Sequence, residues 1–145
     1  MLSLPRFRFH AKQPAREVCL TEAERIELGA KIRRQVLGSE YVDRPGPAPN
    51  KFQQAFRTFT TEHCWANVWV RPGLDYRTRS MLNLAMLAAM ARWHEFEIHV
   101  RGAINNGVTD DELIEIALQV GVYGGVPLAA EAFRAIDKVV KEVRG

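Results

Sequence analysis

Apolar residues recur along most of the chain at the three- and four-residue intervals that are typical of amphipathic helices. The first periodic stretch follows the sequence TEAE at residues 21–24. This is a capping box, in which Thr and Glu side chains satisfy backbone N–H groups that a helix start leaves free. The stretch carries Ile26, Ile32 and Val36. Gly38 is expected to end this first helix.

A proline-rich loop separates the first helix from the second. Residues 43–50, DRPGPAPN, contain three prolines, which forbid a regular ladder of backbone hydrogen bonds. Asn50 is a suitable cap for the helix that follows. On that helix Phe52, Phe56 and Phe59 form one apolar stripe. We expect the stripe to pack into the core.

The middle of the chain predicts two further helical segments. Pro72-Gly73 indicates a turn, after which Asp75 can cap a helix that runs to about Met90. Another helical stretch covers residues 93–104, and Asn106-Gly107 is expected to end it. The sequence leaves open whether these two helices are separate or continuous.

The last two helices have clear start signals. Residues 109–112, TDDE, form a second capping box. Gly124-Gly125 breaks the chain, and Pro127 suits the first turn of the final helix. The residues expected to form the apolar faces of the two helices are Leu113, Ile116, Ala117 and Val120, and then Ala129, Ala132, Phe133, Ile136 and Val140.

These elements predict an all-α protein with about six helices in a single-domain bundle. Residues 21–145 form the helical domain, and residues 1–20, which contain two prolines and no helical period, form an irregular N-terminal arm. No stretch alternates like a strand, and no internal repeat is present. Several helices are apolar on more than one side. This is typical of packing between subunits, although a crowded monomer core would explain it too.

Composition narrows the class of protein. The 145 residues are 47% apolar, and no apolar run reaches the roughly 18 residues of a membrane span. The net charge of +3 is mild and its basic residues are interspersed with acidic ones, so we expect no nucleic-acid partner. Cys19 and Cys64 lack metal-ligand or redox spacing and are expected to be free thiols in a reducing compartment. The N-terminus lacks an apolar signal region, and we expect a cytoplasmic protein.

The candidate chemistry lies near the end of the segment at residues 71–99. If residues 92–99 are helical, Glu95 and His99 lie one turn apart on one face, with Arg92 three residues before Glu95. An acid/base pair and a cation then lie within reach of one small anionic substrate. His94 is five residues from His99, which turns the two rings away from each other on a helix, so we expect no zinc site.

The chain resembles the carboxymuconolactone decarboxylase family, within the alkylhydroperoxidase D-like superfamily. The resemblance covers about residues 21–143. In the superfamily's peroxidase-like members a Cys-x-x-Cys pair precedes the histidine, and Arg92 and Glu95 stand at those two positions here. A disulfide-cycling peroxidase activity is therefore not expected. The matching stretches are RRQVLGSEYVDR at 33–44, His63-x-Trp65-x-x-x-Trp69-x-Arg71-Pro72-Gly73-Leu74, Thr78-Arg79-Ser80, Glu95-x-x-x-His99, Asn106-Gly107-Val108-Thr109 with Glu112, and Tyr123-x-Gly125-Val126-Pro127.

Within this family, the chain most resembles the members that act on 4-carboxymuconolactone. It implies a carboxy-lyase that releases CO2 and 3-oxoadipate enol-lactone in protocatechuate catabolism, the β-ketoadipate pathway. The substrate is a dicarboxylate lactone whose own ring accepts the electrons, so no cofactor and no metal is expected. Family members commonly assemble as trimers or hexamers, so a homo-oligomer is expected. Alternatives are a family member acting on a different lactone or acid, and a non-catalytic oligomeric binding protein that retains the fold.

The resemblance also suggests roles for individual residues. His99 is the expected proton donor or oxyanion partner, and Glu95 orients it or shuttles the proton. A purely structural pair between Glu95 and His99 is the alternative. The expected substrate-binding residues are Arg71, Arg79 and Arg92 for carboxylates, Trp65 and Trp69 as apolar walls, and His63 as an added donor. Each of these residues could instead serve packing or surface ion pairs.

Overall fold

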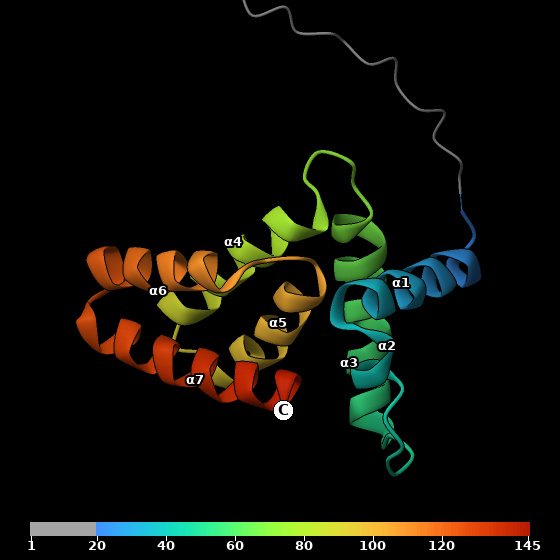
Figure 1. The fold of residues 1–145 in the computed structure, drawn as a ribbon. Helices are drawn as coiled ribbons and strands as arrows, with labels where there is room; N and C mark the ends of the chain where they lie inside the picture. Colours follow the sequence, from blue (N-terminus) through green and yellow to red (C-terminus); the bar gives the residue numbers. More distant parts are fainter. Residues whose placement is uncertain (1–19) are drawn as a thin grey trace, which may run out of the picture.

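A computed structural model describes residues 20–145 and confirms the all-α prediction (Figure 1). Apart from Leu20, the arm predicted over residues 1–20 lies outside the described residues, as does Cys19. The nine-residue element η1 is a π-helix that continues directly from α3. The elements are α1 (Glu22–Leu37), α2 (Ser39–Val42), α3 (Lys51–Thr60), η1 (Thr61–Trp69), α4 (Tyr76–Ala89), α5 (Trp93–Asn105), α6 (Asp110–Gly124) and α7 (Val126–Arg144).

Among residues 20–145, no helix has both the length and the apolar content to cross a membrane.

The predicted helix starts are confirmed by their capping hydrogen bonds. Thr21 and Thr109 each close a reciprocal capping box with the glutamate three residues later. The Asn50 side chain accepts hydrogen bonds from two backbone N–H groups, and the Asp75 side chain accepts one from Thr78 at 2.7 Å. Gly38, at φ 85°, ends α1 as expected. Side-chain caps recognisable in the sequence therefore mark the starts of four of the eight helical elements in residues 20–145.

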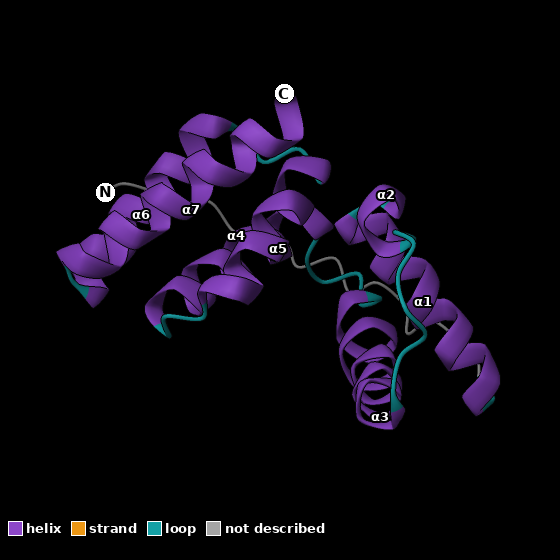
Figure 2. Ribbon diagram, turned by 90° about the horizontal axis from the view of Figure 1, so that it is seen from below, coloured by secondary structure: helices purple, strands orange, loops and turns teal. Residues whose placement is uncertain are grey.

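Two hydrophobic clusters divide the fold, and α5 contributes to both. The larger cluster lies among α4, α5, α6 and α7, where Leu84, Phe96 and Leu113 are fully buried. The smaller cluster is formed by α1 and η1, with Trp65 and Ile98 among its members. Figure 2 shows α5 with the α6–α7 pair on one side and α1 on the other. Because opposite faces of α5 are held by separate clusters, its orientation is fixed along its length.

The contact between α1 and η1 is unusually close. A Cβ atom added to Gly29 would lie 2.4 Å from the backbone oxygen of Thr61. Only glycine permits this approach without moving one of the two backbones. The start of η1 is thereby held directly against α1.

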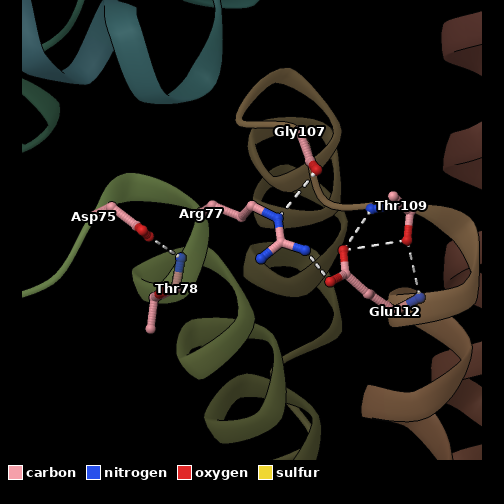
Figure 3. Close-up of polar contacts among 6 residues, drawn as sticks. All are labelled: Asp75, Arg77, Thr78, Gly107, Thr109 and Glu112. Carbon is pink, nitrogen blue, oxygen red and sulfur yellow. Dashed lines mark hydrogen bonds and ion pairs between the residues drawn. The ribbon is translucent and has the colours of Figure 1, made fainter.

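An arginine anchors the start of α4 to the turn between α5 and α6 (Figure 3). The Nε of Arg77 donates a hydrogen bond to the Gly107 carbonyl oxygen at 3.2 Å, and its Nη2 pairs with the carboxylate of Glu112. Glu112 also closes the capping box with Thr109, whose backbone N lies 2.9 Å from Oε2. One carboxylate therefore caps α6 and holds α4.

The expectation that the phenylalanine stripe packs into the core is wrong for this chain. Phe52, Phe56 and Phe59 are 74%, 68% and 57% exposed. Their helical spacing indicates an apolar face, but it does not say what covers that face. Phe133, another expected core residue, is 36% exposed, and Val139, which was not predicted as a core residue, is fully buried. The homo-oligomer stays a prediction.

Candidate active site

The imidazole of His99 lies beside two buried tryptophan rings. The centroid of its ring is 6.4 Å from that of Trp65 and 6.3 Å from that of Trp69, and the planes are inclined by only 19° and 14°. The two tryptophan centroids are 5.2 Å apart. Trp65 and Trp69 come from the π-helix, while His99 comes from the middle of α5. The close packing of α1 on η1 and the two-sided anchoring of α5 bring these three rings together.

Burial sets the charge of His99. Its Nδ1 atom is buried and has no hydrogen-bond partner among the described residues. Burial lowers the pKa of His99 from its ordinary 6.5 to about 4, because removal from water disfavours the charged imidazolium. The negative charge of Glu95 raises the pKa of His99, but by less than burial lowers it. His99 is therefore a neutral imidazole at pH 7.

A first hollow, of about 350 Å³, opens on one side of this histidine. We call it the aromatic hollow. No guanidinium, ammonium or carboxylate group of the described residues lines it. Cys64, which is an exposed free thiol, is among its lining residues. The full set is Thr60, His63, Cys64, Trp65, Val68, Trp69, Asn83 and His99.

A second hollow, of about 620 Å³, shares Thr60, Trp65 and His99 with the first. We call it the cationic hollow, because its polar lining is basic or neutral and no described carboxylate contributes to it. Its remaining walls are apolar side chains from α1, α3 and α5 and two prolines of the loop before α3. The polar lining residues are Arg33, Gln53, Arg57, Thr60, His94 and His99.

The predicted acid/base pair is only partly formed. Glu95 lies one turn before His99 on α5, but it is exposed and makes no hydrogen bond to the imidazole among those found. The structural alternative, in which a hydrogen bond from Glu95 satisfies the imidazole, is not formed among the described residues. The helix begins at Trp93, as predicted, so the condition that Arg92 be helical is not met. Ala91, at φ 55°, and Arg92, at φ −91° and ψ 69°, separate α4 from α5, so Arg92 precedes the helix and is exposed.

The other predicted residues divide into two groups. His63, Trp65 and Trp69 line the aromatic hollow, as expected for residues around a substrate. Arg71 and Arg79 line neither hollow. They lie beside each other, with the Nη2 of Arg79 donating a hydrogen bond to the Arg71 carbonyl oxygen at 3.2 Å. Within one chain the structure does not bring them to His99.

Sequence reasoning did not predict six polar lining residues of the two hollows, which are Arg33, Gln53, Arg57, Thr60, Asn83 and His94. Arg33 stands at the start of the stretch 33–44 that carries part of the resemblance, which was the one available signal for it. Arg57 lies off the phenylalanine stripe on the helix and reads as an ordinary surface cation.

The described helices thus place a neutral histidine where two hollows of the surface meet, one without charged groups in its lining and one with basic groups. Comparison with known proteins identifies the family. Residues 54–138 match the model of the carboxymuconolactone decarboxylase family, and the chain belongs to that family.

Two curated relatives cover most of the chain. It is 37% identical over 124 residues to a 4-carboxymuconolactone decarboxylase of Acinetobacter baylyi, spanning 86% of this chain and 92% of that protein. It is 41% identical over 115 residues to a nitrosuccinic acid decarboxylase of Metarhizium robertsii, spanning 79% of this chain and 80% of that protein. Both relatives are decarboxylases, with different substrates.

Proposed function

We propose that this protein is a cofactor-free decarboxylase whose substrate is 4-carboxymuconolactone. The observation that carries the proposal is the position of a neutral, half-buried His99 between an aromatic hollow and a cationic hollow. The relative from Acinetobacter supports the choice of substrate.

The protein must fill three roles in the reaction. When the carbon–carbon bond to the departing carboxylate breaks, CO2 leaves and the electron pair moves through the ring double bond onto the lactone carbonyl oxygen. A donor must stabilise this oxyanion. The carbon next to the carbonyl then takes one proton, which neutralises the negative charge that stays on the ring when CO2 leaves. The retained carboxylate must be held throughout, so that the ring stays oriented.

We assign the oxyanion role to His99. A neutral imidazole keeps one N–H donor, and in a site that excludes water this donor interacts strongly with developing negative charge. An imidazole with a pKa near 4 carries almost no spare proton at pH 7, so the proton for carbon comes from solvent. We assign the relay of that proton from solvent to Glu95, which is exposed one turn before His99 and lines neither hollow. Trp65 and Trp69 form the apolar wall where the departing carboxylate loses its charge.

A second candidate substrate is nitrosuccinic acid, favoured by the 41% identity to the relative from Metarhizium. This acid also has two carboxylates, and its nitro group can take the electron pair as the lactone carbonyl does. Both substrates therefore require oxyanion stabilisation, delivery of a proton and binding of the retained carboxylate. They differ in shape, because one is a ring and the other an open chain.

The deciding experiment is release of CO2 by purified protein from each acid, measured against the spontaneous rate. We expect acceleration with freshly generated 4-carboxymuconolactone. Acceleration with nitrosuccinic acid alone would transfer the assignment to the second candidate. If neither acid is decarboxylated faster than in buffer, the proposal fails and a binding protein that keeps the family fold becomes the better account.

A further inference from the structure

Two guanidinium groups of the cationic hollow lack an acidic partner. Arg33 on α1 and Arg57 on α3 both line it, and neither side chain forms an ion pair within residues 20–145. Asp43 interacts electrostatically with Arg33, but it is held by the neighbouring Arg34, whose Nε lies 2.8 and 3.0 Å from the two carboxylate oxygens. The hollow therefore holds positive charge that the described residues do not neutralise.

The surroundings of Arg33 favour the binding of an anion. Its pKa is lowered first by burial and next by the positive charge of Arg57, with Tyr41 and Asp43 acting in the opposite direction. Partial burial of one cation beside another is unfavourable without a counter-ion. A bound carboxylate would relieve both effects, and a planar guanidinium matches two carboxylate oxygens. His94 and His99, the remaining titratable groups of the hollow, add no negative charge.

The hollow also has the right position relative to the histidine. Thr60, Trp65 and His99 line both hollows, so a molecule anchored by one end in the cationic hollow meets these residues with its other end. The far end would lie against the tryptophan rings, where no described cation lines the wall. The two hollows thus differ in charge and meet at His99.

We propose that Arg33 and Arg57 bind the carboxylate that a dicarboxylic acid substrate retains, while the carboxylate that it loses lies in the aromatic hollow. This assignment rests on the proposed function. It also explains substrate choice, because an acid with one carboxylate cannot be anchored and positioned for CO2 loss at the same time. A carboxylate in apolar surroundings is destabilised, and this destabilisation ends as CO2 forms.

The test is calorimetric titration of the full chain with succinate, a dicarboxylate that cannot follow this route to CO2 because it has no electron sink. We expect Arg33→Gln and Arg57→Gln each to weaken succinate binding by roughly 10- to 100-fold, the scale of a lost charge-assisted hydrogen bond. Arg33→Lys, which keeps the charge and loses the planar fork, should fall between wild type and Arg33→Gln. Circular dichroism checks that each variant is folded.

Arg25→Gln is the matched control, because Arg25 is an exposed arginine on α1 that lines neither hollow and, unlike Arg34, does not hold Asp43. Its succinate affinity should equal that of wild type. Equal affinity in all the variants, or no binding of millimolar succinate to wild type, would overturn the assignment. If binding depends on Arg33 and Arg57 but neither candidate acid is decarboxylated, the carboxylate site stands and the proposed function fails.

Discussion

Replacing His99 by alanine is expected to lower kcat for CO2 release by roughly 10²-fold or more, the scale of a lost oxyanion donor or general acid. The reason is that His99, of the three residues that line both hollows, is the one with a titratable side chain, and its imidazole N–H is the donor that we assign to the oxyanion. His99→Gln keeps an N–H donor and should retain more activity than His99→Ala. The measurement is CO2 release under saturating substrate, with thermal melting to confirm the fold.

Glu95→Gln separates proton relay from oxyanion stabilisation in the same assay. Because Glu95 is exposed and makes no hydrogen bond to His99, we expect a smaller fall than for His99→Ala. Glu115→Gln, an exposed carboxylate on α6, controls for a general change in charge. A folded His99→Ala protein with the wild-type kcat would contradict the assigned role.

Replacing Trp65 by alanine is expected to change both stability and the ionisation of His99. Trp65 is buried, and removal of a large core aromatic typically lowers the free energy of unfolding by about 3–5 kcal/mol. The cavity that it leaves gives water access to the imidazole. The pKa of His99 should therefore rise from about 4 toward its ordinary 6.5, because desolvation is the largest cause of its depression.

The pKa of His99 in this variant can be followed by NMR titration of its imidazole signals. Trp93→Ala is the matched control, since Trp93 packs on the larger cluster, with its ring 5.7 Å from that of Phe96. Trp93→Ala should lower the free energy of unfolding and leave the pKa of His99 unchanged. An unchanged pKa of His99 in Trp65→Ala would mean that the tryptophan wall does not shield the imidazole from water.

Local signals predicted most of the fold correctly. A cap is decided by a few neighbouring residues, so Asn50, Asp75 and the two threonine capping boxes could be recognised in the sequence. The break between α4 and α5 could not, because no glycine or proline marks it. There the turn depends on Ala91 adopting φ 55°, a left-handed conformation that an alanine in the sequence does not signal.

The site was harder to predict because it is assembled from distant parts of the chain. His99, Trp65 and Trp69 could be named from the sequence, as could the turn of helix between Glu95 and His99. The placing of Arg33 and Arg57 in one hollow depends on how α1 packs against η1, which continues directly from α3. That packing also exposes the phenylalanine face of α3, which spacing alone had suggested was core.

The pH dependence of kcat/KM for CO2 release tests the central claim most directly, because it reports the ionisation of the free protein. In a His63→Gln/His94→Gln variant, which removes the other two imidazoles that line the hollows, a neutral His99 with a pKa of about 4 requires kcat/KM to stay level from about pH 5 to about pH 8, since neither the imidazole of His99 nor the substrate carboxylates titrate there. A steady fall across that range as pH rises would mean that the charged imidazolium is the active form, and would contradict the account.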